Sequence, residues 1–61
     1  MNPEQRKAVA HLIIAIKDRN GKPVNLNVVI ATIESLGIRE VDVEKDFGFD
    51  SILSLANYIY K

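Results

Sequence analysis

The side chains that could do chemistry gather in one stretch near the C-terminus, DFGFDSILSL, over residues 46–55. Asp46 and Asp50 are paired carboxylates that could exchange a proton, and Ser51 offers a hydroxyl. Acid–base and nucleophilic catalysis need a partner within hydrogen-bond reach. The single histidine, His11, lies far from Ser51 in sequence. The pattern therefore predicts that the protein is not an enzyme, with Asp50 capping a helix and Asp46 on a solvated face.

The acidic residues in and before this stretch have the alternate spacing of the first calcium ligands of an EF-hand. They are Asp42, Glu44 and Asp46. Position six of such a loop would be Phe47, where glycine is needed, and position twelve would be Leu53, where a bidentate glutamate is needed. The chain has no cysteine and one histidine, so it cannot assemble a zinc shell either. We predict no metal site.

The letters DFGFDSI resemble the attachment motif of acyl and peptidyl carrier proteins, in which a serine at the start of the second helix receives a 4′-phosphopantetheine arm. Upstream, IESLGI is similar to the end of a carrier's first helix, so the resemblance covers residues 26–56. It implies that Ser51 is the acceptor, that Asp50 precedes it, and that Ile52 and Leu55 pack the helix. Carrier domains continue through a third and a fourth helix, and ten residues follow Ser51 here.

The same letters also have a purely structural explanation, which stays open beside the resemblance. Gly48 permits a bend, Asp50 caps the helix that follows, and Ser51 suits the first turn. On either explanation, substitution of Gly48 or Asp50 is expected to loosen the fold, because both residues shape the bend before the last helix.

The elements that position this stretch begin with a helix predicted over residues 3–19. Asn2 is a suitable N-cap, a proline takes the first helical position, and Gln5 stands where a capping-box partner reaches back. Apolar residues then recur at helical spacing: Val9, Leu12, Ile13 and Ile16. His11 lies beside this stripe, so we expect it on the surface.

The next segment, NLNVVIATIESLG, matches two patterns. Residues 24–33 alternate like a strand and are rich in β-branched side chains. A helical face is matched by Leu26, Val29, Ile30, Ile33 and Leu36. We predict a helix because Asn25 or Asn27 can cap it, the pattern exceeds the usual strand length, and Gly37 follows as a C′ glycine would.

The remaining residues form an acidic connector, 38–49, and a last helix, 51–60. The connector carries enough apolar residues to lie against the helices and to contain a short helical turn: Ile38, Val41, Val43, Phe47 and Phe49. The last helix has its own stripe: Ile52, Leu55, Ala56 and Ile59. Three apolar stripes predict an all-α fold, a small three-helix bundle that forms a single domain over residues 1–61.

The net charge is zero, but the charges are segregated. Residues 1–22 carry five basic side chains and two acidic ones, and residues 34–50 carry six acidic and two basic ones. No apolar run reaches the length of a membrane span, and the start MNPEQRK lacks the apolar stretch of a signal peptide, so we expect a cytoplasmic protein without a membrane partner. The last helix has no basic residue before Lys61, which argues against nucleic-acid binding.

The leading hypothesis is a non-enzymatic helical interaction module, of the docking, adaptor or small regulator type, that binds another protein or a second copy of itself without a cofactor. A chain of this length buries only about 60% of its unfolded surface, so we expect exposed apolar area. The residues expected at the interface are Leu55, Tyr58, Ile59, Tyr60, Asp46 and Glu44. The alternative is a carrier-like domain with phosphopantetheine on Ser51, and a third hypothesis is weak DNA binding through the basic first helix.

Overall fold

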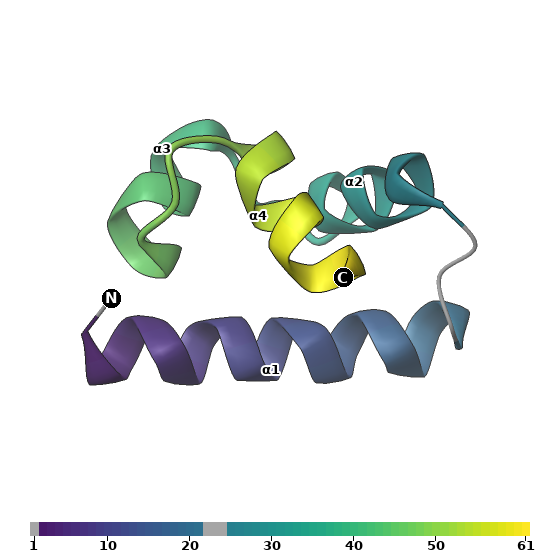
Figure 1. Ribbon diagram of the computed structural model, residues 1–61, viewed down its shortest axis with the longest axis horizontal. Coiled ribbons are helices and arrows are strands. Elements are labelled where there is room, and N and C mark those ends of the chain that lie inside the picture. The colour runs from purple at the N-terminus through teal and green to yellow at the C-terminus, as the bar shows by residue number, and fades with distance from the viewer. Residues whose placement is uncertain (1, 22–24) are drawn as a thin grey trace.

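The computed structural model describes residues 2–21 and 25–61, and it shows helices joined by short turns (Figure 1). The elements are α1 (Pro3–Asn20), α2 (Leu26–Ser35), a single turn α3 (Glu40–Asp42) that runs into a π-helical turn η1 (Val43–Phe47), and α4 (Ile52–Tyr60). The described residues contain no strand, which confirms the predicted all-α fold with a short helical turn in the connector. Val24, the first residue of the strand-like alternation, lies outside the described residues.

Helix α1 begins at the predicted capping box. The Gln5 backbone N–H donates to Asn2 Oδ1 at 2.8 Å, and the Asn2 N–H donates to Gln5 Oε1 at 3.0 Å. Each bond satisfies a donor that the first turn of a helix leaves without a partner. The helix ends before Gly21, whose N–H donates to the Lys17 carbonyl at 2.8 Å. The prediction of residues 3–19 is confirmed to within one residue.

Helix α2 confirms the choice of helix over strand. Asn25 caps it, because its Oδ1 accepts the Val28 N–H at 2.9 Å. The helix ends at Ser35, Leu36 is its C-cap, and Gly37 follows with φ +81°, as expected of a C′ glycine. The buried Thr32 hydroxyl donates to the Val28 carbonyl at 2.8 Å, so this polar group is satisfied inside the fold.

The connector is held against α1 by two buried side chains, Val43 and Phe47, which lie four residues apart on η1. Gly48 ends η1 in the left-handed region, with φ +75° and ψ +25°, which favours glycine. A Cβ added there would lie 2.9 Å from Gln5 Oε1, so the start of α1 and the end of η1 approach closely at this glycine. The predicted bend at Gly48 is confirmed.

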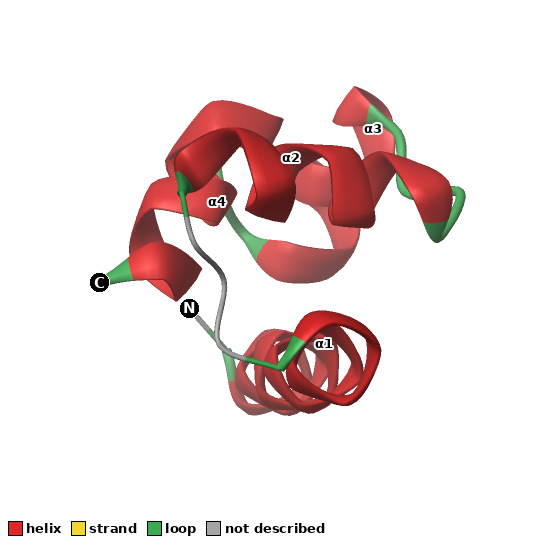
Figure 2. Ribbon diagram, turned by 90° about the vertical axis from the view of Figure 1, so that its right-hand side faces the viewer, coloured by secondary structure: helices red, strands yellow, loops and turns green. Residues whose placement is uncertain are grey.

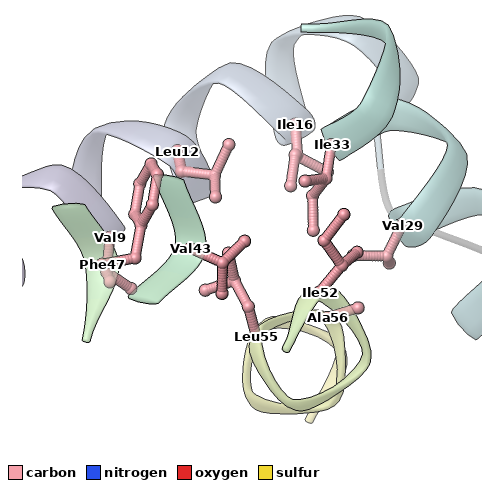
Figure 3. Close-up of a cluster of buried hydrophobic side chains, with 10 residues drawn as sticks. All are labelled: Val9, Leu12, Ile16, Val29, Ile33, Val43, Phe47, Ile52, Leu55 and Ala56. Carbon is pink, nitrogen blue, oxygen red and sulfur yellow. The ribbon is translucent and has the colours of Figure 1, made fainter. Parts of the chain in front are cut away.

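The helices form two layers (Figure 2): α1 lies on one side, and α2, α3 and α4 lie on the other. Helices α2 and α4 pack against each other, and α1 packs mainly against η1. The core between the layers draws on both, as Figure 3 shows. Its buried residues are Val9, Leu12, Ile16, Val29, Ile33, Val43, Phe47, Ile52, Leu55 and Ala56.

Candidate functional site

Ser51 is the N-cap of α4, and the prediction that Asp50 caps this helix is wrong by one residue. Ser51 has extended backbone angles, φ −157° and ψ 164°, and its Oγ accepts the Ser54 N–H at 3.1 Å. Asp50 is exposed and precedes the cap. The reason is the anchor before it: the Phe49 N–H donates to the Val43 carbonyl at 3.2 Å, and the Phe49 side chain packs against the core. This anchor sets the residue at which α4 begins.

Glu40 takes part in the start of α4, and the sequence analysis missed it. Its Oε1 accepts the Ile52 backbone N–H at 3.1 Å from twelve residues away in the chain. A carboxylate at a helix N-terminus satisfies a free donor and suits the positive end of the helix dipole. No local pattern indicates this contact, because it depends on how α3 is placed beside α4.

The Ser51 hydroxyl is engaged both as a hydrogen-bond acceptor and as a hydrogen-bond donor. It accepts the Ser54 N–H and donates to Ser54 Oγ at 3.2 Å. The residue is half-buried at the very start of the helix, which is the place that the carrier resemblance implies for an attachment serine. Attachment of an arm would therefore replace at least the hydrogen bond that the hydroxyl donates.

Helix α4 has a solvent side without a charge. Between Ile52 and Tyr60 the sequence ILSLANYIY contains no acidic or basic residue. Leu53 is 52% exposed, Tyr58 is 54% exposed and Tyr60 is 45% exposed. The exposed apolar area that the composition predicted is thus present, and a large part of it lies on this helix.

The predicted interface residues of α4 do not form one face. Leu55 is 0% exposed, so its assignment to an exposed interface is wrong, and it belongs to the core. Ile59 is half-buried and packs against the core. Tyr58 and Tyr60 are two residues apart, so they project from different sides of the helix. The Tyr58 ring contacts the Phe49 ring, with centroids 5.3 Å apart and planes tilted by 51°.

Leu53 is the interface candidate that the sequence analysis did not select. It lies seven residues before Tyr60, and this spacing places the two on the same side of α4. The signal was available in the sequence, because Leu53 is the one aliphatic of this helix that falls outside the stripe of core positions. Leu53 and Tyr60 thus border the solvent side of α4 along one edge. Tyr58, with its ring against Phe49, borders it along the other edge.

Asp46 and Glu44 are exposed on η1 and are not part of the α4 surface. Asp46 borders an open cavity of about 320 Å³ between the start of α1 and η1. The cavity is lined by Asn2, Glu4, Gln5, Ala8, Lys45 and Asp46. Gln5 is already engaged there, since its Nε2 donates to the Lys45 carbonyl at 3.5 Å. The cavity therefore lies where α1 and η1 contact each other.

The electrostatics of the connector centre on Asp42. Its Oδ2 accepts the Arg39 backbone N–H at 2.9 Å and the Arg39 Nε–H at 3.3 Å. These hydrogen bonds hold the pKa of Asp42 below its ordinary value of 3.8, and the bond from the Arg39 backbone has the largest effect. The alternating acids lie on helical turns instead of a ligand loop. Within the described residues no group of three or more histidine, cysteine or acidic side chains could hold a metal ion.

His11 is exposed on α1, as predicted. No helix in the described part of the chain is both long and apolar enough to cross a membrane. Comparisons with protein-family models, with curated proteins and with solved structures gave no match.

Proposed function

We propose that this chain is a non-enzymatic interaction module that binds another protein through the solvent side of α4. One observation carries the proposal: α4 bears no charge on any side, yet it leaves about half of Leu53, Tyr58 and Tyr60 exposed. The buried centres of protein interfaces are depleted in charged residues and enriched in tyrosine. The solvent side of α4 has both properties, in a chain of which 26% of the residues are charged.

The chemistry of this side also indicates how it binds. A tyrosine offers a large rigid ring with few rotatable bonds and a polar tip, so its burial yields much apolar contact at a low cost in conformational entropy. Ser54 and Asn57 are exposed on the same helix and provide hydrogen-bonding groups. The partner that fits is a protein with an uncharged, largely apolar groove that accepts a short helix.

The experiment is site-specific photo-crosslinking in a lysate of cells that express the chain. A photoreactive residue at position 53 is compared with one at position 34, which is exposed on α2. We expect a discrete adduct from position 53 only, suppressed by excess wild-type protein and not by excess Leu53→Lys/Tyr60→Lys protein. Equal adducts from both positions, or equal suppression by both competitors, would contradict the proposal.

A second candidate is the carrier-like function, because Ser51 is half-buried at the start of α4, three residues after Gly48. Its test is incubation with a phosphopantetheinyl transferase and coenzyme A, followed by intact-mass measurement. An adduct on the wild type and on Ser54→Ala, and none on Ser51→Ala, would support it. Absence of an adduct on the wild type would eliminate it. Ser54→Ala is the matched control because it removes the neighbouring hydroxyl.

A further inference from the structure

The outer side of α1 faces away from all other described helices, as Figure 1 shows along its lower edge. On this side the residues Lys7, Ala10, Ile14 and Lys17 recur at helical spacing and form one line, with Arg6 beside it. We call these five residues the outer face of α1. All are exposed. Ile14 is 56% exposed, with Lys17 three residues and Asp18 four residues further along the same helix.

A surface of the opposite sign lies on α3 and η1, and α3 is at the opposite edge of the molecule in Figure 1. It comprises Glu40, Val41, Glu44 and Asp46, all exposed, and we call it the acidic face. Val41 is 63% exposed, the largest exposed fraction among the exposed large hydrophobic residues of the described chain. Val41 and Glu44 are three residues apart on continuous helical turns, so they share a side.

The two faces are complementary in charge and in apolar content. Helix α1 carries four cations and two carboxylates, and the α3–η1 segment carries four carboxylates and one cation. Within residues 2–21 and 25–61 the only ion pair joins Arg39 and Asp42, so neither face is neutralised by such a pair. Each face also holds one large aliphatic side chain that is more than half exposed, Ile14 on the outer face of α1 and Val41 on the acidic face.

We propose that the outer face of α1 binds the acidic face of a second copy of this chain. Ile14 packs against Val41 of the next copy, and the lysines pair with its carboxylates. An exposed aliphatic on the same line as two lysines, with Asp18 one turn away, fits a protein surface with an aliphatic counterpart better than it fits a row of phosphates. Exposed ion pairs contribute little each and are screened by salt, so the association is weak and depends on ionic strength.

The position of the faces sets the form of the assembly. They lie at different edges of the molecule, so the contact is head-to-tail, and a head-to-tail contact that does not close produces an open series of oligomers instead of a dimer. This contact uses neither Leu53 nor Tyr60, and it is therefore independent of the function proposed for α4.

The test is sedimentation velocity over a concentration series. At a salt concentration of about 0.01 M the average mass is expected to rise past that of a dimer, and at about 1 M the chain is expected to be monomeric, because screening then acts within a few ångströms. Ile14→Ser and Val41→Ser are each expected to weaken the low-salt association roughly fivefold, since each removes one aliphatic contact.

Charge reversal gives the decisive comparison. Lys7→Glu/Lys17→Glu leaves both faces acidic, and Glu44→Lys/Asp46→Lys leaves both basic, so each variant alone is expected to stay monomeric at low salt. An equimolar mixture of the two should associate. Should a reversed variant fail to give a helical circular dichroism spectrum, the neutral pair Lys7→Gln/Lys17→Gln and Glu44→Gln/Asp46→Asn replaces it, with loss of association expected in each.

The proposal would be overturned by a monomeric wild type at low salt, by an associating wild type whose reversed variants do not associate on mixing, or by neutral variants that associate like the wild type. Association that persists at high salt and is lost in Leu53→Lys would also overturn it, and would assign the contact to α4. A monomeric wild type would leave the binding of another protein by α4 unaffected, so the two proposals fail separately.

Discussion

Gly48→Ala is the substitution for which the structure makes the sharpest prediction. It adds one methyl group at the junction of η1 and the turn that leads to α4. Two costs arise there. The backbone has φ +75°, and the new Cβ would lie 2.9 Å from Gln5 Oε1 and 3.0 Å from Gln5 Cδ.

The magnitudes follow from these two facts. An L-residue in the left-handed region costs about 1–2 kcal/mol relative to glycine. The Gln5 side chain is flexible and can move away, but it then loses its hydrogen bond from the Asn2 N–H, and loss of a capping interaction costs about 1 kcal/mol. Together the free energy of unfolding should fall by about 2–3 kcal/mol. A chain of this length has roughly 3–9 kcal/mol in total, so the melting temperature should fall by roughly 10–20 °C.

Gly37→Ala is the matched control. Gly37 has φ +81°, and a Cβ there would meet nothing within 4 Å, so only the backbone cost of about 1–2 kcal/mol applies. In urea unfolding followed by circular dichroism, Gly48→Ala should therefore have a lower free energy of unfolding than Gly37→Ala. In a Gln5→Ala background the cost of Gly48→Ala should fall to that of Gly37→Ala. Equal costs for the two glycines in the wild-type background would refute the argument from the Gln5 contact, and unchanged midpoints would refute both parts.

Three further predictions follow from individual residues. Because the pKa of Asp42 is lowered from 3.8 in the fold, its stabilising contribution is present above that value and is lost as the pH falls through the lowered pKa. Asp42→Asn should therefore be less stable than the wild type at neutral pH, with urea midpoints that converge below pH 3.8, and parallel curves would contradict this. Ser51→Ala should cost about 1 kcal/mol and Asp50→Ala less than about 0.5 kcal/mol in the same assay. Equal losses of unfolding free energy in the two variants would contradict the assignment of Ser51, and not Asp50, as the N-cap. Leu55→Ala should lower the free energy of unfolding by about 2–5 kcal/mol, enough to unfold much of the population, and Leu53→Ala by less than about 0.5 kcal/mol. Similar thermal melts for these two leucines would show that their burial is misassigned.

The start of α1 could be predicted from the sequence, and that of α2 to one of two caps, Asn25 or Asn27, because capping is a local interaction. At Asn2 and at Asn25 the side-chain oxygen reaches a backbone N–H three residues ahead, so the whole interaction lies within one turn. The same locality explains why Gly37 and Gly48 were recognised as positions where the chain turns.

The start of α4 could not be predicted in this way. Both Asp50 and Ser51 are good caps by residue type, and the choice between them was made by distant contacts. Phe49 is anchored to Val43 and the core, and Glu40 reaches the Ile52 N–H across twelve residues. The wrong assignment of Leu55 to an exposed interface has a different origin. Leu55 fits the core stripe of α4, and a residue cannot belong both to that stripe and to the exposed surface.

By itself, the sequence determined the helical class, the apolar stripe of each helix and the separation of positive charge in α1 from negative charge in the connector. These follow from side-chain spacing and from local hydrogen bonds. Only the tertiary structure decided which apolar residues of the connector are buried. Val43 and Phe47 lie in the core, whereas Val41, which the sequence predicts as an anchor of the same kind, is 63% exposed, because burial there depends on which side of the connector another element covers.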